Sequence, residues 1–260
     1  MERVTIRFYE ELNDFLPEDR RKRDFEVEFE LPRSVKDLIE SLGAPHVEVD
    51  LILINGLSVG FDHLVSDGDR ISVYPVFESL DIGAVTHLRP EPLREMRFIL
   101  DVHLCTLARR LRMLGFDTVW ENGAEDEELA SRSIREKRIL LTRDLGLLKR
   151  GAVTHGLFVR AIDPDLQTRE VVERLDLQSK IAPFTRCIRC NGRILPIDDL
   201  DSVRDALESS VPPGVRAWCT EYHRCESCGR YYWEGSHYQR MIDMISRLLP
   251  GKDGNSLDAM

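Results

Sequence analysis

Four cysteines in two pairs constrain this chain more than any other feature of its sequence. Cys187 and Cys190 form one C-x-x-C pair and Cys225 and Cys228 form another, with 34 residues between the pairs. This spacing lets two thiolates on one tight turn bind the same tetrahedral zinc ion, and two such turns complete a four-cysteine site. A redox pair would need a thioredoxin-type βαβ unit, whereas these pairs lie in turns, and nothing supports an iron–sulfur cluster. We therefore expect a structural zinc ribbon with an elongated central hairpin.

The same cysteine pattern bears on the cellular compartment. The 260 residues contain no run of about 20 apolar residues that could span a bilayer, and the first residues lack a signal-peptide core. Paired C-x-x-C spacing in such a chain favours thiolate–metal bonds over disulfides. We expect a cytoplasmic protein with no membrane segment, in which Cys105 and Cys219 are small buried or half-buried residues.

The charge of the chain is unevenly distributed. Residues 1–82 carry 19 acidic and 9 basic residues, whereas the rest of the chain carries 27 of each. The whole net charge of −10 therefore belongs to the N-terminal third. The remainder can present basic patches to an anionic partner, and the arginines Arg109, Arg110 and Arg112 are candidates for one. A solvated helix face explains those arginines equally well.

The N-terminal third has the element order of a small β-grasp domain. Alternating apolar residues predict strands at 3–9, 25–31, 50–54 and 70–74, and Ser34 is placed to cap a helix that ends at Gly43. The segments 6–12, 54–56 and 67–75 resemble the ubiquitin-like sulfur carriers of thiamine and molybdopterin synthesis. Those carriers end in an activated Gly-Gly, but here the corresponding residues, 76–80, read Val-Phe-Glu-Ser-Leu and continue into more protein. We expect a docking or regulatory module rather than a sulfur carrier.

The chain is expected to divide into five parts. Residues 1–78 form the β-grasp domain, and 79–95, with weak periodicity and two prolines, form a linker. From Met96 the pattern alternates strands with helices, which is typical of a parallel α/β sheet. This domain is expected over 96–182, the zinc ribbon over 183–242, and a C-terminal helix with a disordered tail over 243–260. Within the α/β part, Leu129, Ala130 and Ile134 are expected to face the core from a helix at 127–137.

Three aspartates stand at places where a parallel sheet presents a ligand site. Asp101 follows the apolar run 98–100, Asp144 follows the run 139–143, and Asp126 opens a helix expected at the same edge. Grouped carboxylates repel one another unless a cation neutralises them, and Mg²⁺ or Mn²⁺ accepts such oxygen ligands. A metal held there activates water for attack on a phosphodiester. Arg143, beside Asp144, is a candidate phosphate contact, and Asp163 is a candidate fourth acid.

Each of these acids also has a plain structural explanation. Asp126 suits a helix N-cap, Asp101 can simply end a strand, and Asp144 can cap the helix that begins at Leu145. Asp163, followed by Pro164, suits an ordinary turn. Three acids at strand ends are harder to dismiss together than singly.

Several motifs in matching order resemble one nuclease family. They are Asp101, the run 107–118, Asp126 with Leu129, the run 140–144, both cysteine pairs, Val211-Pro212-Pro213 and Tyr232-Trp233-x-Gly235-Ser236-His237. Over roughly 96–242 they look like the PIN-like ribonuclease domain at the C-terminus of the Mut-seven exonuclease. The resemblance implies that Asp101, Asp126 and Asp144 are metal-binding catalytic acids. It also implies a ubiquitin-like domain joined to this ribonuclease domain, which is a known arrangement in that family.

The ribbon combines basic and aromatic residues, a composition that suits single-stranded RNA because bases stack on rings while arginines follow phosphates. The other explanation is that the aromatic residues pack the small ribbon core. The RNA-binding candidates are Arg109, Arg112, Arg189, Arg230, Tyr232, Trp233 and His237. His237 is also placed to cap a helix expected over 238–248.

The sequence therefore predicts a metal-dependent ribonuclease with a PIN-like nuclease domain, a structural zinc site and a catalytic magnesium or manganese site. One alternative is a non-catalytic RNA-binding adaptor, in which the ribbon binds RNA and the acidic ubiquitin-like domain recruits a protein partner. Another is a regulated nuclease whose acidic domain covers a basic cleft until it is displaced. Metal-dependent turnover separates the first alternative from the enzyme, and deletion of residues 1–82 tests the second.

Overall fold

The computed structural model describes residues 1–75, 88 and 95–248. Most of the expected linker and the tail from Gly251 lie outside the described residues. The elements group into two compact units, Met1–Leu104 with Trp120–Val159, and Cys105–Val119 with Arg160–Met260. No described helix is long and apolar enough to cross a membrane.

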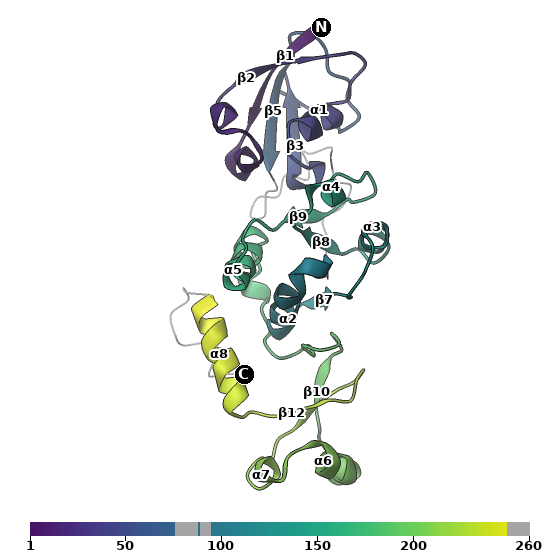
Figure 1. The fold of residues 1–260 in the computed structure, drawn as a ribbon, viewed down its shortest axis with the longest axis vertical. Helices are drawn as coiled ribbons and strands as arrows, with labels where there is room; N and C mark the ends of the chain where they lie inside the picture. Colours follow the sequence, from purple (N-terminus) through teal and green to yellow (C-terminus); the bar gives the residue numbers. More distant parts are fainter. Residues whose placement is uncertain (76–87, 89–94, 249–260) are drawn as a thin grey trace. The chain divides into compact units, whose positions relative to one another are not determined.

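The ubiquitin-like part of the first unit is a mixed sheet with the strand order β2-β1-β5-β3-β4 (Figure 1). Its elements are β1 Glu2–Phe8, β2 Phe25–Phe29, α1 Val35–Ser41, β3 Val49–Ile54, β4 Leu57–Ser58 and β5 Arg70–Pro75. β1 and β5 run parallel and the other neighbours are antiparallel, which confirms the β-grasp expectation. The alternating residues of β1 and β5 point into one apolar core with α1. Ser34 caps α1 by accepting a hydrogen bond from the Asp37 amide.

The rest of the first unit is α/β. Its elements are β6 Arg97–Leu100, α3 Asp126–Arg135, β8 Ile139–Thr142, α4 Leu145–Leu148 and β9 Gly156–Phe158. The strands are parallel neighbours in the order β6-β8-β9, with Leu100 opposite Leu141 and Thr142 opposite Phe158. α3 packs against β6 and β8, and α4 against β8 and β9. This register brings the carboxyl ends of β6 and β8, and hence Asp101 and Asp144, to one edge.

One expectation for α3 is wrong. Leu129 and Ala130 are buried, but Ile134 is 42 % exposed and does not face the core. The helix ends at Arg135, so Ile134 lies in its last turn, where it lines an open hollow with Arg150 and Ala152 instead of the core.

The second unit holds the cysteine motifs together with the helices α2, α5, α6, α7 and α8. Its elements are α2 Cys105–Met113, β7 Asp117–Val119, α5 Pro164–Arg174, β10 Ile194–Pro196, α6 Arg204–Ser210, α7 Pro213–Arg216, β11 His223–Cys225, β12 Tyr231–Tyr232 and α8 Ser236–Leu248. β10, β11 and β12 form an antiparallel sheet in that order. α5 packs against both α2 and α8. Gly115 ends α2 with φ +97°, and a Cβ there would lie 2.1 Å from the Ala182 carbonyl oxygen.

The elongated central hairpin expected between the cysteine pairs is wrong. β10 and β11 do pair, but the chain between them forms the two short helices α6 and α7. Leu207 and Val211 from this insertion bury against Tyr222 and Tyr231 of the ribbon. The insertion therefore has its own small apolar core, which a plain hairpin would not provide.

Candidate acidic site and metal centre

The two cysteine pairs sit on two equivalent turns. In the first, the Asn191 amide donates to the Cys187 carbonyl, and the Cys187 amide donates to the Gly192 carbonyl. In the second, the Gly229 amide donates to the Cys225 carbonyl, and the Cys225 amide donates to the Arg230 carbonyl. Asn191 and Gly229 both take positive φ, +69° and +71°, which lets each turn fold back under its sulfurs.

The sulfur positions fit a tetrahedral metal. The Sγ atoms of Cys187 and Cys228 lie 3.7 Å apart, and those of Cys190 and Cys225 lie 3.4 Å apart. All four ligand atoms lie within 4.8 Å of one another. Zinc–sulfur bonds of about 2.3 Å in a tetrahedron place sulfurs about 3.8 Å apart, close to what is seen. Gly192 is required beside them, because a Cβ there would lie 2.8 Å from the Cys225 sulfur.

The surroundings of Cys187 favour a thiolate. Burial raises the pKa of this thiol, but hydrogen bonds from the Tyr232 hydroxyl, 3.0 Å away, and from the Cys190 and Arg189 amides outweigh it. The pKa of Cys187 is lowered to about 6 as a result. Burial, together with hydrogen bonds to the neighbouring thiols, raises the pKa of Cys190 to about 12. Cys187 therefore loses its proton more readily than Cys190, and binding of a metal would require both thiols to be deprotonated.

The first cysteine turn is fastened to α2 and β7. The Arg112 guanidinium is buried and donates to the carbonyls of Thr118, Ile188 and Arg189 at 2.8, 3.3 and 3.1 Å. Asn191 accepts from the Thr118 amide and donates to Asp117. Arg112 was expected to bind RNA, and this assignment is wrong. Its charged group donates to backbone carbonyls under the turn, and the residue as a whole is only 5 % exposed.

Tyr232 also has a structural partner. Its hydroxyl lies 3.0 Å from the Cys187 sulfur, and burial together with that thiolate raises the pKa of the phenol. A phenol that stays protonated donates to the thiolate across the working pH range. Tyr232 therefore orients a candidate metal ligand, and the residue is only half-exposed.

Asp101 and Asp144 are joined through one hydroxyl. The buried Thr142 donates its Oγ1 proton to Asp101 Oδ2 at 2.8 Å, and the same oxygen accepts from the Asp144 amide at 2.9 Å. Asp144 in turn caps α4, since its Oδ1 accepts from the amides of Gly146 and Leu147. Within the described part of the chain, no hydrogen bond is made to Asp144 Oδ2, and no lysine or arginine pairs with Asp101. This donor set suits an oxygen-liking cation, since a buried carboxylate needs a positive partner.

Asp126 has a different partner from these two acids. It is the first residue of α3, and its Oδ2 lies 3.6 Å from Arg150 Nη2. Among the described residues, the four cysteines are the group of metal-binding side chains whose ligand atoms all lie within 4.8 Å, so the three aspartates are not gathered that closely. Glu125, not Asp126, is the N-cap residue of α3, without a side-chain cap bond.

The other predicted site residues lie on exposed or capping positions. Arg143 is exposed between Thr142 and Asp144. Asp163 caps α5 by accepting from the amides of Asp165 and Leu166. Arg109 is exposed on α2, and Arg189, Arg230 and His237 are exposed around the cysteine turns and on α8. Trp233 is half-buried against the insertion core. His237 lies inside α8, which begins at Ser236, so it does not precede the helix as a cap.

The sequence analysis missed three residues that shape these sites. Thr142 is the last residue of β8, after three apolar residues. A polar residue at that buried position was the signal that could have identified it as a partner of the acids. Asn191 follows Cys190 in a turn that needs positive φ, a conformation that asparagine tolerates well. Arg150 follows α4, and nothing in the local pattern connects it with Asp126.

Two family models match the two main parts of the chain. A family model described as the Mut7-C RNAse domain matches residues 96–245, and one described as Mut7-C ubiquitin matches residues 1–81. A solved structure titled putative molybdopterin converting factor, subunit 1, from Pyrococcus furiosus is 20 % identical and covers 30 % of this chain and 100 % of its own, with a TM-score of 0.24. The comparison with curated proteins gives no match. The first family model spans more than half of the chain and includes the three aspartates and the four cysteines, so the chain belongs to the Mut7-C RNAse family and carries a Mut7-C ubiquitin domain before that region.

Proposed function

We propose that the chain is a metal-dependent ribonuclease that hydrolyses phosphodiester bonds of single-stranded RNA at Asp101, Asp126 and Asp144. The observation that carries the proposal is the Asp101–Thr142–Asp144 connection at the ends of two parallel strands. It supports a shared acidic site at the edge where open α/β sheets bind ligands. Membership of an RNAse family supports the reaction class.

The chain's own groups divide the work in this proposal. Thr142 fixes the Asp101 carboxylate by occupying Oδ2, which leaves Oδ1 with only a 3.4 Å contact from the His103 amide. The α4 amides fix Asp144 in the same way through Oδ1. The free oxygens of these two acids, with Asp126 after release from Arg150, would hold Mg²⁺ or Mn²⁺. A bound ion supplies a water of lowered pKa and neutralises charge on the phosphodiester. Arg143 is assigned a phosphate contact.

Zinc is the proposed occupant of the cysteine site, where it would hold the ribbon turns together. Four thiolates in closed tetrahedral positions leave no open coordination position for substrate, which is the pattern of structural zinc. The exposed Arg189 and Arg230 beside the turns are then available for RNA phosphates, together with Arg109 and His237.

Cleavage of labelled single-stranded RNA tests the proposal. The wild-type chain is compared with Asp101→Asn and Asp144→Asn, with Mn²⁺ or Mg²⁺ added or omitted. Asparagine caps helices as well as aspartate does, so Asp144→Asn keeps α4 intact while removing the charge. We expect activity only with added metal and a loss of about 100-fold or more in each variant.

Asp199→Asn is the matched control, because Asp199 is also an exposed aspartate whose Oδ1 accepts from amides two and three residues further on, those of Asp201 and Ser202. This variant should keep full activity, and Asp163→Asn decides whether that residue is a fourth acid. RNA binding without cleavage in the wild-type chain would contradict the enzymatic proposal and leave a binding protein.

A further inference from the structure

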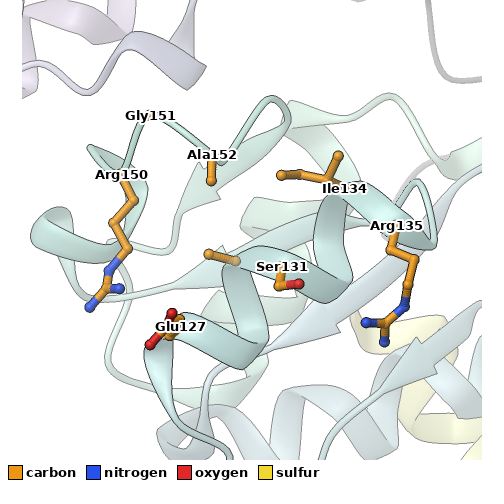
Figure 2. A pocket seen from close by; sticks show the side chains of 8 residues that line it. Glu127, Ser131, Ile134, Arg135, Arg150, Gly151 and Ala152 are labelled. Atoms are coloured by element: carbon orange, nitrogen blue, oxygen red, sulfur yellow. The ribbon is translucent and has the colours of Figure 1, made fainter.

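A hollow of about 670 Å³ lies along α3, outside the acidic site (Figure 2). One wall is the α3 face that carries Glu127, Ser131 and Ile134, and the other is the segment from Arg150 to Ala152 after α4. Its volume falls in the range of sites that hold small ligands or one unit of a polymer. The hollow is open to solvent, so an extended chain can pass through it.

Apolar side chains line the middle of the hollow. Ala130 and Ile134 lie one helical turn apart on the face of α3 that lines it, and Ala152 lies opposite. Ile134 is 42 % exposed although its helix neighbours Leu129 and Ala130 are buried. An isoleucine left in solvent inside a concave surface provides a contact for a flat apolar group of a ligand.

Arginines stand at the two ends of this apolar strip. Figure 2 shows Arg150 and Arg135 at opposite ends, with Ser131 between them. The partner of Arg135 is Glu136, 3.3 Å away, but Glu136 also binds Arg132 and Arg138. Burial raises the pKa of Glu136, but its bonds to Arg132 and Arg138 outweigh this effect and lower the pKa to about 2. Glu136 is therefore a carboxylate that contacts three guanidinium groups. Arg135 lies farther from Glu136 than Arg132 and Arg138 do, each of which is 2.8 Å away, and its side chain is 64 % exposed, so a phosphate can reach it.

Arg150 connects the hollow with the acidic residues. It lines the hollow and lies 3.6 Å from Asp126, and both side chains are nearly half exposed. Such an exposed ion pair is weak because solvent screens it, so a phosphate can compete for the arginine. A cation at Asp126 would favour that exchange, because it would repel the guanidinium.

We propose that the hollow between α3 and residues 150–152 binds one nucleotide of single-stranded RNA beside the cleavage position, with Arg150 and Arg135 on the phosphates that flank it and Ile134 under its base. Its place beside the cleavage position rests on the function proposed above. Two cationic ends with an apolar middle match the phosphate–base–phosphate pattern of an unpaired strand. A duplex hides the base faces and would leave Ile134 without a contact.

The test measures binding in the full-length chain with Asp101→Asn as background, so that the RNA is not cut. Anisotropy of a short labelled single-stranded RNA is followed over a series of salt concentrations. Each phosphate contact on a single strand contributes about 0.7 to the slope of log affinity against log salt, so Arg135→Gln with Arg150→Gln should lower the slope by about 1.4. Ile134→Glu should weaken binding about 10-fold or more, whereas Ile134→Leu should bind as the background does.

Arg23→Gln with Arg70→Gln is the control, because it removes the same charge from exposed positions of the ubiquitin-like part. An unchanged salt slope in the Arg135 and Arg150 double variant would overturn the inference, and so would a change in slope equal to that of the control. Unchanged RNA affinity in Ile134→Glu would overturn it too, because the hollow would then serve something other than RNA, such as a protein segment. The two proposals fail separately. If the double variant has a lower salt slope but the wild-type chain does not cleave RNA, only the ribonuclease proposal is wrong. If the wild-type chain cleaves RNA but the salt slope of the double variant is unchanged, only the nucleotide site is wrong.

Discussion

The connection between Asp101 and Asp144 depends on a single hydroxyl group. Thr142 is fully buried, donates to Asp101 and accepts from the Asp144 amide. Thr142→Val keeps the shape of the side chain but leaves a buried carboxylate without its donor. We expect a loss of about 1–3 kcal/mol in the free energy of unfolding, measured by urea denaturation, together with lower cleavage activity.

Thr142→Ser keeps the hydroxyl, so this variant should retain most of the wild-type stability and cleavage activity. If Thr142→Val were as stable and as active as the wild type, the hydroxyl would not be holding the two acids in place.

Single residues were predictable where their role follows from local position. Asp101 and Asp144 could be placed at strand ends, because a run of apolar residues followed by an acid gives that position directly. Their connection depends on the register that sets Leu100 opposite Leu141, and this register is a property of the folded sheet. Arg112 was misassigned for a similar reason. The apolar stripe of α2 says nothing about the cysteine turn that covers Arg112 from a distant part of the chain.

At the scale of elements, the cysteine turns were the easiest to predict and the chain between them the hardest. Two C-x-x-C pairs that lie in turns predict metal-binding turns, whatever chain lies between the pairs. The intervening chain was expected as a hairpin, but Leu207 and Val211 are spaced to pack one face of a short helix against Tyr222 and Tyr231. α6 has only seven residues and is followed by Val211-Pro212-Pro213. This segment is too short for its apolar periodicity to distinguish a helix from a loop.

Tyr232 tests how the ribbon strands support the metal site. Tyr232→Phe keeps the ring on β12 but removes the hydroxyl that lies 3.0 Å from the Cys187 sulfur. Loss of such a partner typically lowers metal affinity by about 10- to 100-fold, and we expect a change of this size in competition with a zinc chelator. The pKa of Cys187 should also rise toward that of an ordinary thiol, because a hydrogen bond that lowers it is removed.

Tyr222→Phe is the matched control for this measurement. Tyr222 is also a ribbon tyrosine, but its hydroxyl donates to the Cys219 carbonyl at 3.1 Å, away from the four ligands. Equal zinc affinities in the two variants would show that the Tyr232 hydroxyl does not act through the thiolate.

At the largest scale, the ubiquitin-like part covers the open edge of β9 within the first unit. Glu48 is buried and accepts from the Phe158 amide at 2.6 Å, on the side of β9 that faces away from β8. His46 lies between Glu40 and the Val153 carbonyl, and the Lys149 ammonium donates to the Glu40 carbonyl. An uncovered strand edge invites pairing with other chains, so this contact protects the sheet. The docking role expected for the N-terminal domain remains a prediction as far as other proteins are concerned.

These contacts come from β-grasp residues whose purpose the sequence does not disclose. Glu48 lies in an acidic domain where most carboxylates are exposed, and nothing in the segment His46–Glu48 singles it out before β9 is placed beside it. The order of elements in each part could be predicted from periodicity. The pairing of parts far apart in the sequence could not, because it depends on tertiary packing that local patterns do not encode.

Glu48→Ala therefore tests whether the ubiquitin-like part acts as a support for the nuclease sheet. The substitution leaves the Phe158 amide without its acceptor, which should cost about 1–3 kcal/mol in the free energy of unfolding. Amide hydrogen exchange should quicken at Phe158 and along residues 153–158, because the edge strand opens more often. Glu28→Ala, at an exposed position of β2, removes the same charge and should leave both measurements unchanged.

RNA binding should also weaken in Glu48→Ala, because the segment that carries Arg150 is held at Lys149 and Val153 by the same domain. A domain that instead covers the site would give the opposite result, with RNA cleavage rising when its contact is weakened.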